Sequence, residues 1–390
     1  MKRILVSLLL VLVIVSILAA ACSTPTTPAP APTTTAPAPA PTTAAPVPGT
    51  TTAAPTATAK PTASPTAPAP TTPTKQITLS FSDFGQPRGQ SKIYEWVADQ
   101  MDKQTNGQVK IQITYGATLG PAAENLDGLR LKVFDMALYA PAYAPGKTPL
   151  LSVGMQPLLT GDVVAAGKGY IDYLKLPDVQ KEQDQWNIIT LFPTALPTYN
   201  LLGRRPIQKV EDYKGAKITA LSGFAKLMAA MGGEVSSMPV MDAFSAMEKG
   251  IIDFGSYSLY TYVAYGMHKL PGMKYISLVN HGVLVSFVGI NRDVFNSLPQ
   301  NARDILMKLS AESAVKNAEF HQVEEDRAVA EYKATGVQFY EMLPGEHSRQ
   351  VQIAQEKVWP EWIADINKRG IDGQKYLDSL RAYFKKYESS

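Results

Sequence analysis

The sequence predicts an α/β fold of two lobes for residues 75–390, preceded by two segments of very different composition. Residues 75–390 are long enough to bury two sizeable cores. From residue 77 onward, stretches with the alternation of strands are interleaved with stretches of helical periodicity, which is typical of parallel sheets covered by helices. A mostly helical region follows a buried strand at residues 283–290.

The first 22 residues have the pattern of a bacterial export signal. Lys2 and Arg3 precede an apolar run over residues 4–18, and three alanines then lead to Cys22. This ending resembles a lipobox, with Ala19 where such motifs usually have leucine. We therefore expect cleavage and lipidation at Cys22. The alternative is a retained N-terminal membrane anchor, for which the apolar run is short.

The mature chain would be nearly neutral and free of thiols. Loss of Lys2 and Arg3 leaves 37 − 2 = 35 basic against 34 acidic residues, a net charge of +1. This balance gives no reason to expect nucleic acid as a partner. Cys22 is the single cysteine of the chain, so a lipidated protein could use neither a disulfide nor a cysteine nucleophile.

Residues 23–74 are expected to form an unfolded stalk. They consist almost entirely of proline, threonine and alanine, with one charge at Lys60. Such a segment has too few large apolar side chains to offset the entropy of ordering. Its prolines favour extended polyproline II, at about 3.1 Å per residue.

The start of the folded part alternates between strands and helices. Ile93, Val97 and Met101 recur at helical spacing before a stop at residues 106–107. Strand, helix, strand, helix, strand implies parallel pairing with right-handed crossovers. The expected strands are 77–81, 109–113 and 134–139, with one helix that contains residues 93–101 and ends near residue 106 and a second at about 122–131.

The remaining elements are predicted by the same patterns. A proline-rich loop over 141–149 comes first, and the second lobe begins near Leu201. A helix behind Pro299 continues to about residue 335, longer than an ordinary globular helix, with Leu306, Leu309 and Val315 on its apolar stripe. The other expected helices are 162–176, 177–185, 223–231 and 242–249, and the expected strands are 187–192, 217–220, 251–255 and 283–290.

Residues suited to catalysis are scarce. His268, His281, His321 and His347 lack metal-ligand spacing, and no serine elbow or phosphate-binding glycine loop is present. Residues 253–255 spell the kinase metal motif Asp-Phe-Gly without its companion loops, and we expect them where a strand ends in a turn. The sequence therefore predicts a protein without catalytic residues, cofactor or metal.

The segment from residue 205 to residue 257 carries a family resemblance. Its landmarks are Arg205-Pro206-Ile207, Lys214-Gly215-Ala216-Lys217-Ile218-Thr219, Met238-Pro239 and Gly250-Ile251-Ile252-Asp253. With Leu119-Gly120, Phe134-Asp135-Met136 and Leu298-Pro299 in order around it, the chain resembles the DctP-like solute receptors of TRAP transporters over residues 76–360. The resemblance implies a two-lobed, type II periplasmic-binding-protein fold with hinge crossovers and a long bracing helix.

The resemblance also implies boundaries, location and partners. Lobe 1 would comprise residues 75–198 and 284–323, lobe 2 residues 199–283 and 324–360, and a helical tail residues 361–390. Such receptors act outside the cytoplasm and hand a small solute to small and large membrane subunits. Alternatives are an ABC-type substrate-binding lipoprotein, and a tethered extracellular enzyme or adhesin.

We expect the solute in a cleft between the lobes, beside strand ends and helix N-termini. The candidate binding residues share aromatic or hydroxyl side chains at such positions. They are Phe84, Tyr139, Tyr143, Thr194, Tyr199, Thr219, Ser222, Phe224, Ser256, Tyr257 and Tyr260.

The family's carboxylate-binding arginine falls on Thr219, and its usual asparagine falls on Tyr257. A threonine hydroxyl cannot neutralise a buried carboxylate. We therefore expect a neutral or partly apolar solute rather than a plain dicarboxylate, or an acid held by another cation. Arg88 and Arg130 are the candidate cations, whereas Arg205 is expected to be structural.

Overall fold

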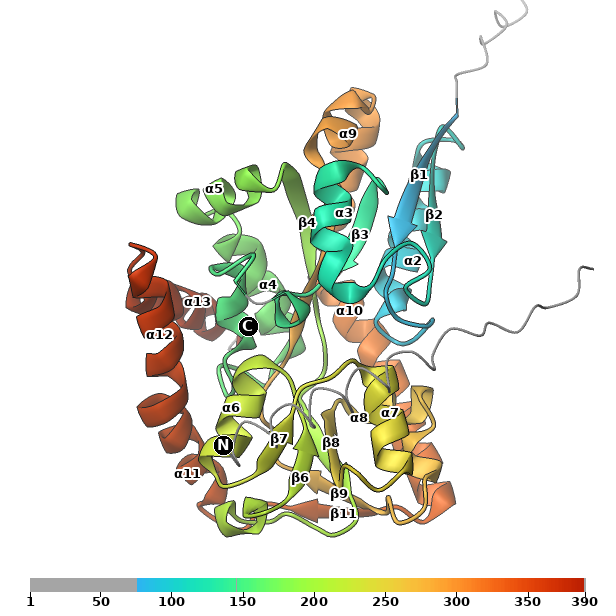
Figure 1. Cartoon of the computed structure of the whole chain (residues 1–390). Helices are drawn as coiled ribbons and strands as arrows, with labels where there is room; N and C mark the ends of the chain where they lie inside the picture. Colours follow the sequence, from blue (N-terminus) through green and yellow to red (C-terminus); the bar gives the residue numbers. More distant parts are fainter. Residues whose placement is uncertain (1–75, 145, 389–390) are drawn as a thin grey trace, which may run out of the picture. The chain divides into compact units, whose positions relative to one another are not determined.

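The computed structural model describes residues 76–144 and 146–388, which form two α/β lobes (Figure 1). The predicted signal, Cys22 and the predicted stalk lie outside the described residues. Within those residues, no helix is both long enough and apolar enough to cross a membrane.

The first lobe is built on a five-stranded sheet in the order β2-β1-β3-β10-β4. β1 pairs in parallel with β2 and β3, as predicted, and β10 runs antiparallel to β3 and β4. The strands are β1 (Ile77–Ser82), β2 (Val109–Thr114), β3 (Met136–Tyr139), β4 (Ile188–Ala195) and β10 (Val285–Asn291). The helices are α2 (Ser91–Gln104), α3 (Asn125–Leu131), α4 (Val163–Tyr173), α5 (Pro177–Gln185) and α9 (Arg292–Ser297).

The second lobe has a six-stranded sheet in the order β11-β9-β5-β8-β6-β7. Its strands are β5 (Asn200–Gly203), β6 (Lys217–Thr219), β7 (Glu234–Ser236), β8 (Phe254–Tyr257), β9 (Tyr275–Leu278) and β11 (Gln338–Glu341). Its helices are α6 (Ser222–Ala230), α7 (Val240–Glu248) and α8 (Leu259–Ala264). Short 3-10 turns cover Ala122–Glu124, Pro141–Tyr143, Leu151–Met155, Val210–Tyr213 and Met267–Lys269.

Two segments that connect the lobes pair with each other, and we call them the hinge pair (residues 196–199 and 279–284). The Leu196 N–H donates to the Leu284 carbonyl at 2.9 Å, and the Tyr199 N–H donates to the Gly282 carbonyl at 2.9 Å. The His281 N–H returns a bond to the Tyr199 carbonyl at 3.0 Å. The two crossings are therefore held together as one two-stranded connection.

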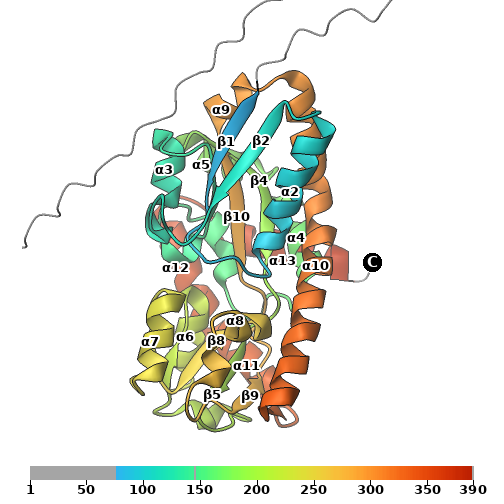
Figure 2. The same ribbon diagram turned by 90° about the vertical axis from the view of Figure 1, so that its right-hand side faces the viewer.

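Helix α10 (Gln300–Thr335) is a third link between the lobes, and Figure 2 shows it running beside both. The Asn317 amide donates to the Ala195 carbonyl at the end of β4, at 2.7 Å. Farther along the helix, the Tyr332 hydroxyl donates to the Leu259 carbonyl of the second lobe at 2.5 Å. This confirms the predicted long helix and its bracing contacts.

The C-terminal helices return to the first lobe. They are α11 (Glu346–Ile353), a π-helical turn (Ala354–Val358), α12 (Trp359–Lys368) and α13 (Gly373–Glu388). Phe384 of α13 packs on Tyr170 of α4 with ring centroids 5.9 Å apart. Gly169 permits this approach, because a Cβ there would lie 2.6 Å from the Phe384 ring.

The structure corrects the predicted position of one strand. β8 begins at Phe254, whereas the prediction placed a strand at 251–255 and put Ser256 and Tyr257 beyond its end. The turn that closes α7 uses this stretch, since the Ile251 N–H donates to the Ala246 carbonyl at 2.9 Å. Ser256 and Tyr257 therefore lie within β8, and the Asp-Phe-Gly motif lies at the start of a strand rather than at its end.

Two smaller expectations also differ from the structure. Leu306 and Leu309 are buried as predicted, but Val315 is 42% exposed and lies outside the apolar stripe of α10. β5, β7, β9 and β11 were not predicted, because strands of three or four residues seldom display a clear alternating pattern.

His321, in the middle of α10, generates a prediction about pH. Its ring is buried, stacks on Tyr260 with centroids 5.2 Å apart, and has no hydrogen-bond partner at either nitrogen. Burial, reinforced by the Arg88 charge, lowers the pKa of His321 to about 3. An unfolded histidine titrates near 6.5, so between these values the unfolded chain binds a proton that the folded chain rejects.

Stability should therefore be lost through this group as the pH falls from about 6.5 towards 3. We expect wild type to lose about 2–3 kcal/mol more than His321→Phe between pH 7.5 and pH 4.5. Urea unfolding at the two pH values measures the difference. Equal losses in the two proteins would contradict this role of His321.

Candidate functional site

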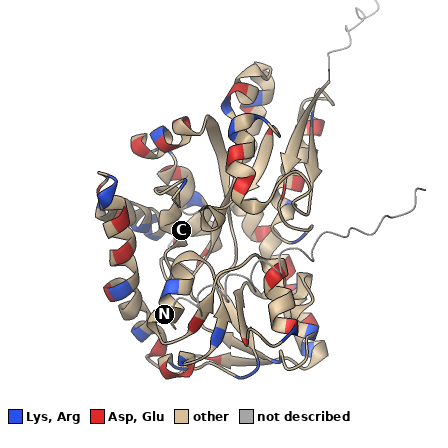
Figure 3. Ribbon diagram, in the orientation of Figure 1, with Lys and Arg blue, Asp and Glu red and all other residues tan. Residues whose placement is uncertain are grey.

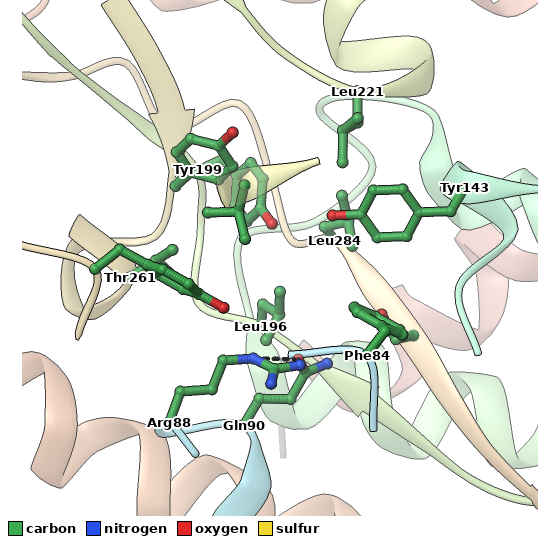
Figure 4. A pocket seen from close by; sticks show the side chains of 13 residues that line it. Phe84, Arg88, Gln90, Tyr143, Leu196, Tyr199, Leu221, Thr261 and Leu284 are labelled. Atoms are coloured by element: carbon green, nitrogen blue, oxygen red, sulfur yellow. Dashed lines mark hydrogen bonds between the residues drawn. The ribbon is translucent and has the colours of Figure 1, made fainter. Parts of the chain in front are cut away.

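A cavity lies between the two lobes and receives residues from both sheets and from the hinge pair (Figure 4). It contains about 480 Å³ of empty space, part of which is open to solvent. Its lining combines aromatic, aliphatic and a few polar side chains, a composition typical of small-molecule sites. The lining residues are Phe84, Arg88, Gln90, Tyr143, Leu196, Tyr199, Leu221, Val240, Tyr257, Thr261, Tyr265, Leu284 and Ser286.

One corner of the cavity holds a buried ion pair. Arg88 Nη1 lies 3.1 Å from Asp83 Oδ2, and the side chains are 7% and 0% exposed. Asp83 follows β1 and also accepts bonds from the Gly85 N–H, at 2.8 Å, and from the Tyr94 hydroxyl. Burial is the largest single influence on Arg88 and opposes its charge, but Asp83 and the neighbouring tyrosines together raise the pKa of Arg88 well above its ordinary value. The guanidinium therefore stays charged and paired.

Gln90 completes this corner. Its Oε1 accepts bonds from Arg88 Nε at 3.1 Å and from Arg88 Nη2 at 2.5 Å (dashed in Figure 4). Its Nε2 donates to Thr194 Oγ1 at 2.9 Å, and Thr194 in turn donates to the Ser286 carbonyl at 3.2 Å. The Arg88 side chain is thus fixed from two sides.

Aromatic rings form much of the remaining wall. The Phe84 and Tyr143 rings meet edge-on with centroids 5.3 Å apart, and the centroids of the Tyr199 and Tyr257 rings lie 6.1 Å apart. Figure 4 shows the Tyr143 hydroxyl directed into the cavity. Burial raises the pKa of Tyr143 to about 12, partly offset by Arg88, so this hydroxyl remains a hydrogen-bond donor at neutral pH.

Three buried hydroxyls in the second lobe have no hydrogen-bond partner. They belong to Thr219 on β6 and to Ser256 and Tyr257 on β8. β6 and β8 are adjacent, with Thr219 opposite Gly255. Burial raises the pKa of Tyr257, and the nearby Thr219 hydroxyl lowers it slightly without reaching hydrogen-bond geometry. Buried polar atoms left unpaired are rare in native proteins, so each calls for an explanation such as strain, a functional role, or a bound water or ion.

Some sequence-predicted residues line the cavity and others lie behind its wall. Phe84, Tyr143, Tyr199, Tyr257 and Arg88 line it. The buried residues that support the lining are Thr194, which holds Gln90, Phe224, whose ring centroid lies 5.4 Å from that of Tyr199, and Thr219, whose hydroxyl lies near Tyr257. Ser256 is buried in β8 and is not among the lining residues.

The remaining predicted residues are not among those that line the cavity. Tyr139 hydrogen bonds to Thr190 at 2.6 Å inside the first lobe, and Ser222 begins α6 with φ of 51°. Tyr260 stacks on His321 next to Arg88 but lines a neighbouring hollow. Arg130 lies over the Trp186 ring at 5.8 Å.

Sequence reasoning missed several lining residues, chiefly Gln90, Leu196, Tyr265 and Leu284. Gln90 precedes the first residue of α2 in a strand-to-helix loop, a position at which a ligand contact could have been suspected. Leu196 and Leu284 reach the cavity because the hinge segments pair, which no local pattern reveals. Within the described residues, no three histidine, cysteine, aspartate or glutamate side chains gather as a metal site.

Comparison with known proteins identifies relatives. Residues 89–365 match the family described as bacterial extracellular solute-binding protein, family 7. A solute-binding protein of Albidiferax ferrireducens is 24% identical over 273 residues, covering 68% of this chain and 79% of that protein. The C4-dicarboxylate-binding periplasmic protein of Rhodobacter capsulatus is 24% identical over 290 residues, 70% of this chain and 82% of that protein.

A solved structure shares the architecture. The TRAP solute-binding protein from Rhodoferax ferrireducens, in complex with copurified benzoate, superposes with a TM-score of 0.74 at 20% identity. The alignment covers 80% of this chain and 99% of that one. The likeness establishes the two-lobed fold with its long helix.

The unpartnered hydroxyl of Tyr257 predicts a gain in stability on its removal. Tyr257→Phe keeps the ring and deletes a buried polar atom without a partner, so we expect the ligand-free protein to gain about 1 kcal/mol. Urea unfolding measures the change.

Tyr262→Phe is the matched control. The Tyr262 hydroxyl donates to the Gly255 carbonyl at 2.5 Å and accepts the Leu202 and Tyr257 N–H groups, so its loss should cost about 1–3 kcal/mol. A loss of stability in Tyr257→Phe comparable to that in Tyr262→Phe would show that the Tyr257 hydroxyl is satisfied after all.

Proposed function

The chain belongs to the bacterial extracellular solute-binding proteins of family 7, the TRAP-type DctP family, and on this premise we propose that it delivers a small organic solute to TRAP membrane subunits. This family consists of extracytoplasmic binding proteins and not enzymes. The partners would be the small and large subunits of the transporter. An ABC-type receptor and a tethered enzyme or adhesin are less well supported by this membership.

The observation that carries the proposal is the cavity lined from both lobes. Leu221, the residue before α6, and Val240, the first residue of α7, reach the cavity from the second lobe. Phe84 and Gln90 reach it from the loop after β1 in the first lobe. A solute that touches both groups would favour the closed arrangement of the lobes over an open one. The hinge pair and α10 supply connections about which such a movement could occur.

We propose that the cargo is not a plain dicarboxylate. Two carboxylates in a buried site need matching cations, and Arg88 is the cation among the described residues that line the cavity. Thr219 contributes no charge, is fully buried and lies beside Tyr257. The Rhodobacter capsulatus relative is named for binding C4-dicarboxylates, so this receptor would differ from it in its cargo.

Aromatic side chains would make most contacts with the solute. Phe84, Tyr143, Tyr199 and Tyr257 offer ring faces and hydroxyls, and Thr194 acts indirectly through Gln90.

Outside the described residues, we propose that Cys22 is lipidated after export and that residues 23–74 tether the receptor to the membrane. Mass spectrometry of the exported protein would detect the lipid on Cys22.

A ligand screen tests the receptor proposal. The purified full-length protein is unfolded and refolded to remove bound solute, then examined by thermal shift and calorimetry against organic acids, aromatics, amino acids and polyols. We expect micromolar or tighter binding of a compact aromatic or polar solute, a raised melting temperature, and weakening by at least tenfold in Tyr199→Ala. Arg130→Met is the control and should bind as wild type, because Arg130 lies over the Trp186 ring and does not line the cavity.

Two results would count against these proposals. Binding of no small solute would refute the receptor function. Tight binding of C4-dicarboxylates by wild type would refute the proposed cargo while leaving the receptor function in place.

A gain-of-function pair tests the role of Thr219. The double substitution Thr219→Arg with Tyr257→Asn restores the arrangement expected from the family and removes the ring that fills the adjacent space. We expect at least a tenfold gain in calorimetric affinity for a monocarboxylate such as benzoate. Tyr257→Asn alone is the control, and an equal gain in it would assign the effect to space rather than charge.

A further inference from the structure

We propose that Gln90 makes the cavity selective for uncharged solutes, because its side chain and Asp83 together use up the arginine edges that a carboxylate would need. The inference rests on the proposed receptor function and narrows its substrate class. It concerns a residue that reaches the cavity from the loop before α2.

A count of donors supports this assignment. An arginine side chain has five N–H groups, and a carboxylate pairs best with two of them on one edge. The edge formed by Nε and Nη2 is occupied by Gln90 Oε1 at 3.1 and 2.5 Å. Nη1 donates to Asp83 at 3.1 Å and to the Gln86 carbonyl at 2.9 Å. One N–H, on Nη2, is left for a solute, and it can make a single bond.

Gln90 is held in this orientation rather than resting there by chance. Its Nε2 donates to Thr194 Oγ1 at 2.9 Å, and the Thr194 hydroxyl is committed to the Ser286 carbonyl. Turning the amide over would place its N–H groups against the donors of Arg88. Gln90 is 3% exposed and Thr194 is 0% exposed, so water offers little compensation for a broken bond.

The charge balance of the corner points the same way. Asp83, fully buried, already neutralises Arg88. A second carboxylate would leave an excess negative charge in a buried site, which is costly without another cation. Lys92 and Arg327 line the neighbouring hollow instead. They are already paired there, because Lys92 Nζ lies 3.0 Å from Glu95 Oε2 and Arg327 Nη1 lies 3.7 Å from Glu324 Oε2.

The solute class follows from these contacts. Aromatic walls favour a planar or ring-containing molecule, and the free Arg88 N–H favours one carbonyl or amide oxygen. The Tyr143 and Tyr257 hydroxyls can donate to, or accept from, a second neutral polar group. An uncharged cyclic amide or aromatic amide meets all of these requirements.

Matched acid and amide pairs test the inference. Benzoate and benzamide, 3-hydroxybenzoate and 3-hydroxybenzamide, and nicotinate and nicotinamide differ mainly in charge. They are titrated calorimetrically into solute-free full-length protein at pH 7.5, together with any solute found in the broader screen. We expect the amide to bind at least tenfold more tightly than its acid.

Two variants identify Gln90 as the cause. Gln90→Ala frees the Nε and Nη2 edge, so the acid should gain at least tenfold and the preference should shrink or reverse. Gln86→Ala is the matched control, because Arg88 contacts the backbone oxygen of Gln86 and not its side chain. It should keep the preference of wild type.

The outcomes separate this inference from the receptor function. Acids that bind wild type as tightly as their amides, or an acid-to-amide ratio that Gln90→Ala leaves unchanged, would overturn the role of Gln90 and leave the receptor function standing. The same change of ratio in Gln86→Ala would also overturn it. A protein that binds none of the pairs and no solute of the broader screen would refute both proposals.

Discussion

The pairing of the two hinge segments is the constraint on which the rest of the molecule depends. The two segments of the hinge pair, residues 196–199 and 279–284, exchange backbone hydrogen bonds, so these two crossings form one ladder rather than two loose strands. The same ladder places Leu196, Tyr199 and Leu284 in the cavity. These three residues therefore both connect the lobes and line the cavity, so a substitution at any of them would affect the connection and the binding surface together.

The cavity divides into two chemically distinct halves. The first lobe supplies a corner in which Asp83, Arg88 and Gln90 satisfy one another. The second lobe supplies the Tyr257 hydroxyl on β8, which has no partner. A ligand would therefore gain little from the saturated corner and more from the unsatisfied side, which places the polar recognition of a solute mainly in the second lobe.

Sequence patterns predicted the local elements better than the site. Strands β1 and β2, helix α2 and the long α10 follow from short-range periodicity. The start of β8 was predicted too early because Ile251 and Ile252, which look like strand residues, belong to the turn that ends α7. Gln90 was missed, and Tyr139 was placed with the cavity, because strand position alone does not determine which side chain reaches a space between lobes. The identity of Thr219 was visible, whereas the burial of Arg88 required the tertiary structure.

The compactness of the charged corner in sequence has an evolutionary consequence. Asp83, Arg88, Gln90 and the Gln86 carbonyl all come from the loop between β1 and α2, and their hydrogen bonds outside this loop include those to Tyr94 and Thr194. Such a loop can accumulate substitutions while both sheets, the hinge pair and α10 stay unchanged. A lineage of these receptors could therefore change the charge of the solute it binds through one or two amino-acid substitutions, with every intermediate sequence still folded.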